Sequence, residues 1–253
     1  MKTAEIKAIL EQTEITKLPQ VIESFAADER STVQKMLTSY RKKIDAYEKE
    51  LLRTEQMKKY EKAYEEYTYI CGIDEAGRGP LAGPVVAGAV VLPKDCDILY
   101  LNDSKQLSEK KREELYEVIM EKAVAAGVGI VSPQVIEEIN ILQATYEAMR
   151  MAIGKLSVAP DLLLNDAVKI PEVSIRQVPI IKGDAKSISI AAASILAKVT
   201  RDRMMYEYDK LYPEYGFAGH KGYGSASHMA AIRAYGPCPI HRMTFLKNIL
   251  GEN

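Results

Sequence analysis

The sequence has no tryptophan, and only three phenylalanines and three cysteines among its 253 residues. The cysteines, Cys71, Cys96 and Cys238, are odd in number and lack CxxC spacing, which argues against a disulfide framework or a structural zinc site. Charged residues interrupt every apolar run before it reaches membrane-span length. Residues 1–5 lack the apolar core of a signal peptide. We therefore expect a cytoplasmic protein with no membrane partner.

An excess of charge of either sign is also missing, since 34 Lys and Arg residues balance 35 Asp and Glu residues and leave a formal net charge of -1. This balance excludes a uniformly basic nucleic-acid binder. The charges are unevenly distributed along the chain, however. Residues 95–147 hold 5 bases and 11 acids, whereas residues 176–247 hold 11 bases and 5 acids. The composition therefore permits a basic groove beside an acidic site.

Glycine is missing from the first 67 residues, which contain one proline, Pro19. After Ser31, apolar residues recur from Val33 to Leu51 in steps of four and three, the heptad spacing of a long helix. The pattern changes phase after Leu51, which predicts a bend or a change of packing partner. We expect a helical extension over residues 1–67, which acts either as a clamp on a duplex or as an arm that docks a partner.

From Thr68 onward, short apolar runs alternate with amphipathic stretches. The pattern predicts strands at residues 69–73, 85–92, 127–131, 162–165 and 173–180, and helices at residues 110–126, 134–156, 189–211 and 228–235. The second of these helices contains an expected break at Asn140. This order of elements predicts an α/β domain over residues 68–253, with a mixed sheet and helices on its faces.

Carboxylates follow three of the predicted strands. They are Asp74 and Glu75 after the first strand, Asp166 after the fourth and Asp184 after the fifth. Neighbouring side chains of a strand point to opposite faces, so Glu75 reaches the same site as Asp74 only if the chain bends at the strand end. Clustered carboxylates attract a cation, and an all-oxygen ligand set favours Mg²⁺ or Mn²⁺ over zinc. Two such ions can activate water and stabilise the leaving oxygen of a phosphodiester.

A glycine-rich loop follows the first acidic pair. Gly77 and Gly79 allow the chain to turn and let a ligand approach the backbone closely. Arg78 between them can donate hydrogen bonds to phosphate or sugar oxygens. The plain alternative for Asp74 and Glu75 is a solvated pair of acids in a turn. The preceding apolar strand and the Gly-Arg-Gly loop favour a substrate site instead.

Four further residues are candidates for contact with a substrate: Lys105, Lys186, Ser187 and Tyr223. Lys105 follows a predicted turn, where a phosphate contact and a solvated side chain are equally expected. Ser187 can cap the next helix, whose positive end suits a phosphate, and Lys186 lies beside the acid Asp184. Tyr223 stands between glycines, where it either stacks on a sugar or base or fills a gap in the surface.

Other basic residues and the histidines are less informative. Three basic residues of one predicted helix either supplement the substrate site or form a solvated face: Lys198, Arg201 and Arg203. The three histidines are too scattered in the sequence to predict a metal site: His220, His228 and His241. His241 with Arg242 is a candidate pair for supporting or contacting a substrate.

Three segments resemble the sequence patterns of ribonuclease HII, the bacterial type 2 ribonuclease H. They are CGIDEAGRGPLAGPVV at Cys71–Val86, KGDAKSISIAAASILAKVTRD at Lys182–Asp202, and the Gly-Tyr-Gly of Gly222–Gly224. The resemblance runs from residue 68 to the C-terminus and implies a ribonuclease H-like fold with dependence on Mg²⁺ or Mn²⁺. One departure is Asn165, because an aliphatic residue commonly precedes the third acid of the family.

The resemblance also implies roles for individual residues. The family's four catalytic acids correspond to Asp74, Glu75, Asp166 and Asp184, with the first three as metal ligands. The family's Gly-Arg-Gly loop reads the ribose 2′-hydroxyl. Its stacking tyrosine, which favours a deoxyribose beyond the junction, corresponds to Tyr223.

The implied reaction is cleavage of RNA in RNA–DNA hybrids, and cleavage 5′ of ribonucleotides embedded in duplex DNA. It leaves 3′-hydroxyl and 5′-phosphate ends by two-metal catalysis and serves ribonucleotide removal. These nucleic acids are the expected partners, and we expect a monomer. The alternatives are a DNA junction nuclease of the same fold and a nucleic-acid binding module without catalysis.

Overall fold

The computed structural model describes residues 1–250, with the backbone alone for residues 248 and 249. The chain divides into two units, Met1–Gln56 and residue 57 to the C-terminus. The boundary expected after residue 67 stays a prediction. Tyr60, Tyr64 and Tyr67 pack against the core of the second unit, in the cluster that includes Leu162.

The first unit is helical, as predicted. Helices α1 (Thr3–Gln12) and α2 (Leu18–Ser24) pack against the N-terminal half of α3 (Ser31–Met57). Their shared core is formed by Ile6, Leu10, Leu18, Ile22, Val33, Leu37 and Tyr40. The predicted apolar stripe is thus buried at its start, whereas Leu51 near its end is 42% exposed. The bend expected after Leu51 lies later, between α3 and the short helix α4 (Lys59–Ala63).

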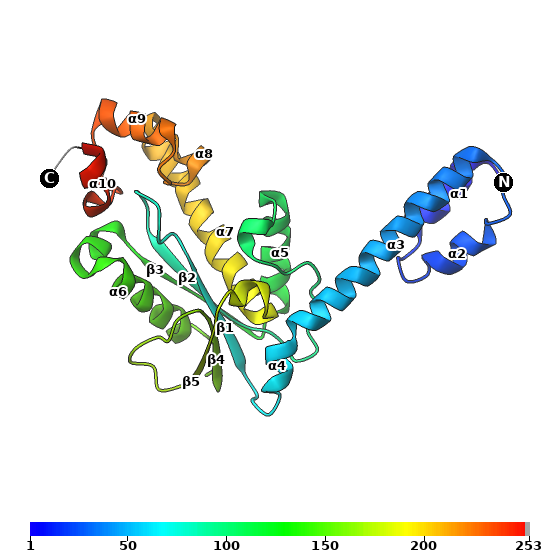
Figure 1. The fold of residues 1–253 in the computed structure, drawn as a ribbon, viewed down its shortest axis with the longest axis horizontal. Coiled ribbons are helices and arrows are strands. Elements are labelled where there is room, and N and C mark those ends of the chain that lie inside the picture. The colour runs from blue at the N-terminus through cyan, green and yellow to red at the C-terminus, as the bar shows by residue number, and fades with distance from the viewer. Residues whose placement is uncertain (251–253) are drawn as a thin grey trace. The chain divides into compact units, whose positions relative to one another are not determined.

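The second unit is built on a five-stranded mixed sheet in the order β3-β2-β1-β4-β5 (Figure 1). The strands are β1 (Ile70–Ala76), β2 (Val85–Val91), β3 (Ala125–Val131), β4 (Leu162–Asp166) and β5 (Arg176–Ile180). The pairs β1–β2 and β2–β3 are antiparallel, and β1–β4 and β4–β5 are parallel. The predicted mixed sheet is confirmed, with a fifth strand shorter than expected.

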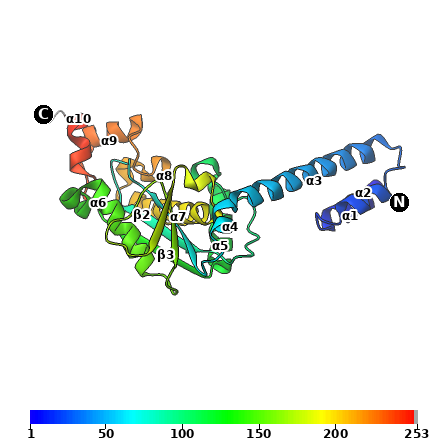
Figure 2. The same cartoon turned by 60° about the horizontal axis from the view of Figure 1, so that its bottom comes forward.

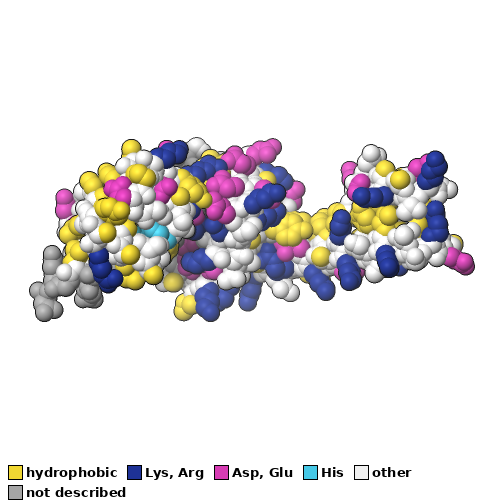
Figure 3. All heavy atoms as spheres, turned by 90° about the horizontal axis from the view of Figure 1, so that it is seen from above, with side chains coloured by type: hydrophobic (Ala, Val, Ile, Leu, Met, Phe, Trp, Pro, Cys, Tyr) yellow, Lys and Arg dark blue, Asp and Glu magenta, His cyan; other side chains and the backbone are white. Residues whose placement is uncertain are grey.

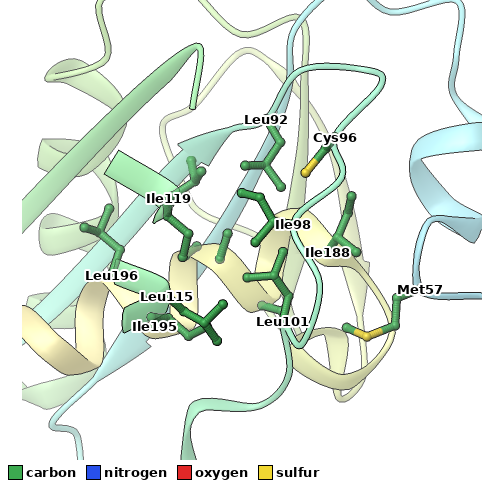
Figure 4. Packing of buried hydrophobic residues seen from close by; sticks show 14 of the residues in the cluster. Met57, Leu92, Cys96, Ile98, Leu101, Leu115, Ile119, Ile188, Ile195 and Leu196 are labelled. Atoms are coloured by element: carbon green, nitrogen blue, oxygen red, sulfur yellow. The ribbon is translucent and has the colours of Figure 1, made fainter. Parts of the chain in front are cut away.

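Helices cover both faces of this sheet (Figure 1; Figure 2). Helix α6 (Pro133–Gly154) packs on one face, and α7 (Ile188–Leu211) with α5 (Glu109–Lys122) on the other. Figure 4 shows the core beneath α7, where Leu115 and Ile119 of α5 meet Leu196 of α7. Helix α7 approaches β1 so closely that a Cβ on Gly72 would lie 2.0 Å from the carbonyl carbon of Ser189.

The C-terminal part of the second unit forms a separate small core. It contains η3 (Pro213–Tyr215), α8 (Phe217–His220), α9 (Ala226–Tyr235) and α10 (Met243–Leu250). Phe217, Ile232 and Leu246 are buried there together with Met205 of α7. Short 3₁₀ turns, η1 (Ser104–Gln106) and η2 (Gly183–Ala185), precede α5 and α7. No helix of the described residues is long and apolar enough to cross a membrane.

Two local predictions have different outcomes. The break in α6 is confirmed, since Asn140 has φ 66° and ψ 164° and its Oδ1 accepts hydrogen bonds from the amides of Leu142 and Gln143. The bend expected at the end of the first strand lies after both acids. Strand β1 continues through Glu75, which pairs with Ala87 of β2, and the chain bends at residues 78 and 79.

Candidate active site

Asp74 and Asp166 occupy adjacent positions on neighbouring parallel strands. The register pairs Ile73 of β1 with Asn165 of β4, so the two acids follow side by side. Since side chains alternate along a strand, Asp74 points to the same face as Gly72, which is the face covered by α7. Ile73 packs on the α6 face. The carboxyl end of the sheet therefore brings these two predicted acids together.

The Asp74 carboxylate is buried, with 4% of its surface exposed. Its Oδ1 accepts a hydrogen bond of 2.8 Å from the Glu75 amide. Burial raises the pKa of Asp74 well above its ordinary value, and the neighbouring Glu75 and Asp166 carboxylates raise it further. The Ser194 hydroxyl of α7 opposes this pKa shift through a hydrogen bond. A carboxylate in such surroundings favours a proton or a cation nearby.

Glu75 contributes to the same acidic site from the end of β1. Burial raises its pKa, and Arg78 opposes that rise through an ion pair of 3.2 Å between Glu75 Oε1 and Arg78 Nη1. Asp166 raises the Glu75 pKa and the Asp74 pKa alike, because it lies close to both. Glu75 thus interacts with the other acids although it lies within β1, one residue before the strand ends at Ala76.

Asp184 lies in the turn η2, directly after β5. The Gly183 amide of this turn donates a 2.7 Å hydrogen bond to Asp166 Oδ1, which ties the turn to the end of β4. Burial raises the pKa of Asp184, as do the carboxylates of Asp103 and Asp166. Lys105 Nζ lies 3.7 Å from Asp184 Oδ2 and 3.5 Å from Asp103 Oδ1. The four predicted acids are therefore neighbours, and Asp103 joins them.

The acids suit a hard divalent cation in their chemistry, because all of their donor atoms are carboxylate oxygens, and burial together with their mutual repulsion raises three of their pKa values. As described, however, residues 1–250 contain no group of three or more His, Cys, Asp or Glu side chains arranged to hold a metal ion. Each acid has a partner from the chain instead: the Glu75 amide for Asp74, Arg78 for Glu75, Lys105 for Asp184 and the Gly183 amide for Asp166.

The Gly-Arg-Gly loop is held from inside by a buried arginine. Arg242 has no exposed surface, and its guanidinium donates to the carbonyl oxygens of Gly77 (2.6 Å), Arg78 (2.9 Å) and Gly83 (2.7 Å). Gly77 has φ 95°, a backbone conformation that favours glycine. Burial lowers the pKa of Arg242 to about 9, with a further contribution from Arg201. The loop is thus fixed before any substrate arrives.

Arg201 of α7 is the second buried arginine. It donates to the carbonyl oxygens of Pro84 and Ala82, each at 3.0 Å, and to that of Lys221 at 2.9 Å. The alternative of a solvated side chain is therefore wrong for Arg201, which is fully buried. Its bonds join the loop after β1 to the segment that carries Tyr223.

Tyr223 lies beside the Gly-Arg-Gly loop. A Cβ on Gly79 would lie 4.0 Å from Cε1 of its ring, and the ring is 5.9 Å from the Arg201 guanidinium. The side chain is 45% exposed. The Leu81 amide donates to the Gly222 carbonyl oxygen at 2.9 Å, which connects the two loops directly. An exposed aromatic ring therefore stands next to the loop that follows the acids.

The predicted basic residues do not all gather here. Lys186 is exposed and donates to the Ile181 carbonyl oxygen, and Lys198 and Arg203 form ion pairs with acids of α7 and α5. Ser187 is buried as the cap of α7. Its hydroxyl accepts from the Ile190 amide and donates to Glu61, so it presents no free group at the surface.

Comparisons with known proteins identify the family of this chain. The family model for ribonuclease HII matches residues 71–248, and the model for the ribonuclease HII N-terminal domain matches residues 2–65. The chain belongs to the ribonuclease HII family. Members of this family are hydrolytic endoribonucleases that depend on a divalent metal ion.

Other members of the ribonuclease HII family are similar to this chain over most of its length. Ribonuclease HII of Lachnoclostridium phytofermentans is 64% identical over 90% of this chain and 90% of its own length. That of Clostridioides difficile is 58% identical over 97% of each chain. The crystal structure of ribonuclease H2 from Pyrococcus horikoshii OT3 superimposes on this chain with a TM-score of 0.61. The matched part covers 72% of this chain and 97% of the other, with 30% sequence identity.

Sequence reasoning missed Asp103, because its closeness to Asp184 depends on the packing of η1. It named Arg201 and Arg242 as candidates but did not predict that both are buried, because arginine is usually exposed. The available signal was their setting, since Arg201 lies within an apolar, alanine-rich helix and Arg242 follows a histidine.

Proposed function

We propose that this ribonuclease HII cleaves the RNA strand of RNA–DNA hybrids, and cleaves 5′ of single ribonucleotides embedded in duplex DNA, leaving 3′-hydroxyl and 5′-phosphate ends. One arrangement carries the proposal. A buried group of acids at the carboxyl end of the sheet adjoins a rigid Gly-Arg-Gly loop, and Tyr223 stands on the other side of that loop. Such a site can combine hydrolysis with recognition of a single sugar.

The acids would hold the metal ions. Asp74, Glu75, Asp166 and Asp184 are the ligands we propose, and Mg²⁺ or Mn²⁺ supplies Lewis acidity toward the attacking water and the leaving oxygen when bound. Burial and mutual repulsion raise the carboxylate pKa values in the protein by itself, and a divalent cation would relieve the repulsion.

The loops would select the substrate. The Arg242 guanidinium holds the carbonyl groups of Gly77 and Arg78 inside the protein, so the loop presents a fixed backbone to the sugar that carries the 2′-hydroxyl. Tyr223 would stack on the next sugar, and Arg78 and Lys105 would meet the phosphates on either side. Ser187 is not part of this proposal, because its hydroxyl is buried and bonded to Glu61.

Cleavage of matched duplexes tests the proposal. A DNA duplex with one ribonucleotide, the same duplex without it, and a branched all-DNA substrate are incubated with Mg²⁺ or Mn²⁺ and with chelator. We expect a single cut 5′ of the ribonucleotide and no cut in the other two substrates. Equal cleavage of the branched DNA would identify a junction nuclease, and binding without cleavage a non-catalytic module.

Two variants assign the chemistry to the acids. Asp74→Asn should abolish cleavage, and it should also abolish the rise in thermal unfolding midpoint that Mg²⁺ causes in the wild type. Asp97→Asn is the matched control, because Asp97 is exposed and pairs with Lys122 at the surface. Full activity of Asp74→Asn, or equal losses in both variants, would overturn the assignment.

A further inference from the structure

All three histidines of the protein lie together beneath Tyr223, although they are far apart in the sequence. The His220 and His228 rings stack with their centroids 4.3 Å apart, and the His228 and His241 centroids are 5.2 Å apart. Phe217 packs against all three rings. In Figure 3 histidine surface is visible as one small patch among hydrophobic side chains.

Hydrogen bonds connect two of these rings to the backbone of Tyr223. The Cys238 amide donates to His241 Nδ1 at 2.9 Å, so this nitrogen carries no proton. The proton of neutral His241 is then on Nε2, which lies 3.0 Å from His228 Nε2. His228 Nε2 must accept, which places the His228 proton on Nδ1, 2.9 Å from the Tyr223 carbonyl oxygen.

The third ring holds the residue before Tyr223. The Gly222 amide donates to His220 Nδ1 at 3.2 Å, and His220 Nε2 lies 2.8 Å from the Tyr215 carbonyl oxygen. Gly222 itself has φ 83°, and a Cβ there would lie 2.5 Å from the Ala82 carbonyl oxygen. The backbone on both sides of the Tyr223 ring is therefore fixed by histidine nitrogens.

This chain of bonds has one direction and requires neutral rings. A second proton on His228 would place an N–H opposite the N–H of His241, and a second proton on His241 would place one opposite the Cys238 amide. The other titratable groups that face the rings are Tyr215 and Cys238, with Glu214 near both. Among these described neighbours, a compensating carboxylate could come from Glu214 alone.

We propose that His241 and His228, with His220, are positioning residues that hold Tyr223 in place for its contact with the substrate, and that His241 and His228 do so only while they are neutral. The inference deepens the proposed function, because it rests on the stacking role of Tyr223. Burial lowers the pKa of His241 to about 4 and also lowers that of His228, in agreement with rings that stay neutral at physiological pH.

Nuclear magnetic resonance tests the geometry independently of activity. With only three histidines, nitrogen-15 spectra of the side chains can resolve each ring in the full-length protein. We expect a proton on Nδ1 of His228 and on Nε2 of His220 and His241 at pH 7.5, with His228 and His241 resisting protonation below pH 6.5. A proton on Nε2 of His228, or ordinary titration of both rings, would overturn the proposal.

Kinetics tests the consequence for substrate choice. The ratio of kcat/KM for a DNA duplex with one ribonucleotide to kcat/KM for a continuous RNA–DNA hybrid is measured from pH 8 to pH 4.5. Protonation of the acids affects both substrates and cancels in this ratio. We expect the wild-type ratio to fall on acidification toward that of Tyr223→Ala, which should be low and independent of pH. Stacking on an aromatic ring sets the size of this fall at ~5–100-fold.

A wild-type ratio that does not change with pH would contradict the inference. So would a ratio for Tyr223→Ala that falls on acidification as much as the wild-type ratio.

At pH 7.5, His228→Phe should lower the ratio by a larger factor than it lowers kcat/KM for the continuous hybrid. Thermal unfolding shows whether this variant is folded. If it is not, the comparison of the wild type with Tyr223→Ala still decides. Absence of cleavage of both substrates at pH 8 would count against the proposed function, whereas the tautomers would still report on the positioning role.

Discussion

The guanidinium of Arg242 donates a hydrogen bond of 2.6 Å to the carbonyl oxygen of Gly77, although 165 residues separate them in the chain. Both groups are shielded from solvent, and the other Arg242 bonds also go to main-chain carbonyl groups, those of Arg78 and Gly83. Burial of a charge is costly unless its hydrogen bonds are made. The Gly-Arg-Gly loop therefore has its shape because the C-terminal segment closes beneath it.

Replacing this arginine should damage the loop more than the fold. Arg242→Met keeps most of the volume but leaves the carbonyl groups of Gly77, Arg78 and Gly83 without their donor, at about 1–3 kcal/mol for each buried group that finds no other partner. We expect kcat/KM to fall by more than tenfold while a cooperative unfolding transition remains. Arg233→Met, at an exposed arginine, is the matched control and should leave both unchanged.

Strand β1 and helix α7 should tolerate no side chain at Gly72. A Cβ would lie 2.0 Å from the Ser189 carbonyl carbon and 2.1 Å from its oxygen, and main-chain atoms cannot move aside as a side chain does. Gly72→Ala should therefore destabilise the protein by about 3 kcal/mol or more, measured by urea unfolding. Gly154→Ala meets nothing within 4 Å and should be neutral or stabilising by up to about 1 kcal/mol. Equal stabilities of the two variants would contradict this packing.

Ser187 should act on stability and not on catalysis. Its hydroxyl caps α7 through the Ile190 amide and donates to Glu61 at 2.6 Å, so Ser187→Ala should lower the free energy of unfolding by about 1–2 kcal/mol. We expect kcat/KM to stay within about twofold of the wild type once the variant is folded. A tenfold loss of kcat/KM with unchanged stability would show instead that Ser187 contacts the substrate. Ser39→Ala, at an exposed position of α3, controls for the substitution itself.

The histidine chain should also appear in the dependence of stability on pH. Burial lowers the pKa of His241 to about 4, and the neighbouring His228 contributes to this shift to a smaller extent. An unfolded histidine titrates near 6.5. As the pH falls from 6.5 toward 4, the unfolded chain takes up a proton that native His241 does not, so the free energy of unfolding falls. Urea unfolding at several pH values should give a shallower fall for His241→Asn than for the wild type. Identical slopes would show that His241 titrates alike in both states.

Local sequence patterns determined most of the fold. Alternating apolar residues, glycine and proline fixed the order of strands and helices, and Asn140 marked the break in α6. The positions of Asp74, Asp166 and Asp184 at strand ends were enough to predict a shared site, because the carboxyl ends of adjacent parallel strands meet at one edge. These features depend on residues that are neighbours in the chain.

Tertiary packing alone decided the rest. The packing of the tyrosines in and after α4 onto the core of the second unit depends on distant strands, and the burial of Arg201 and Arg242 follows from loops that arrive from distant parts of the chain. Periodicity identifies which side chains are apolar, but it does not identify the carbonyl group that a buried arginine or histidine will meet. That partner exists only once segments far apart in sequence have closed around it, as His241 and His228 have around Tyr223.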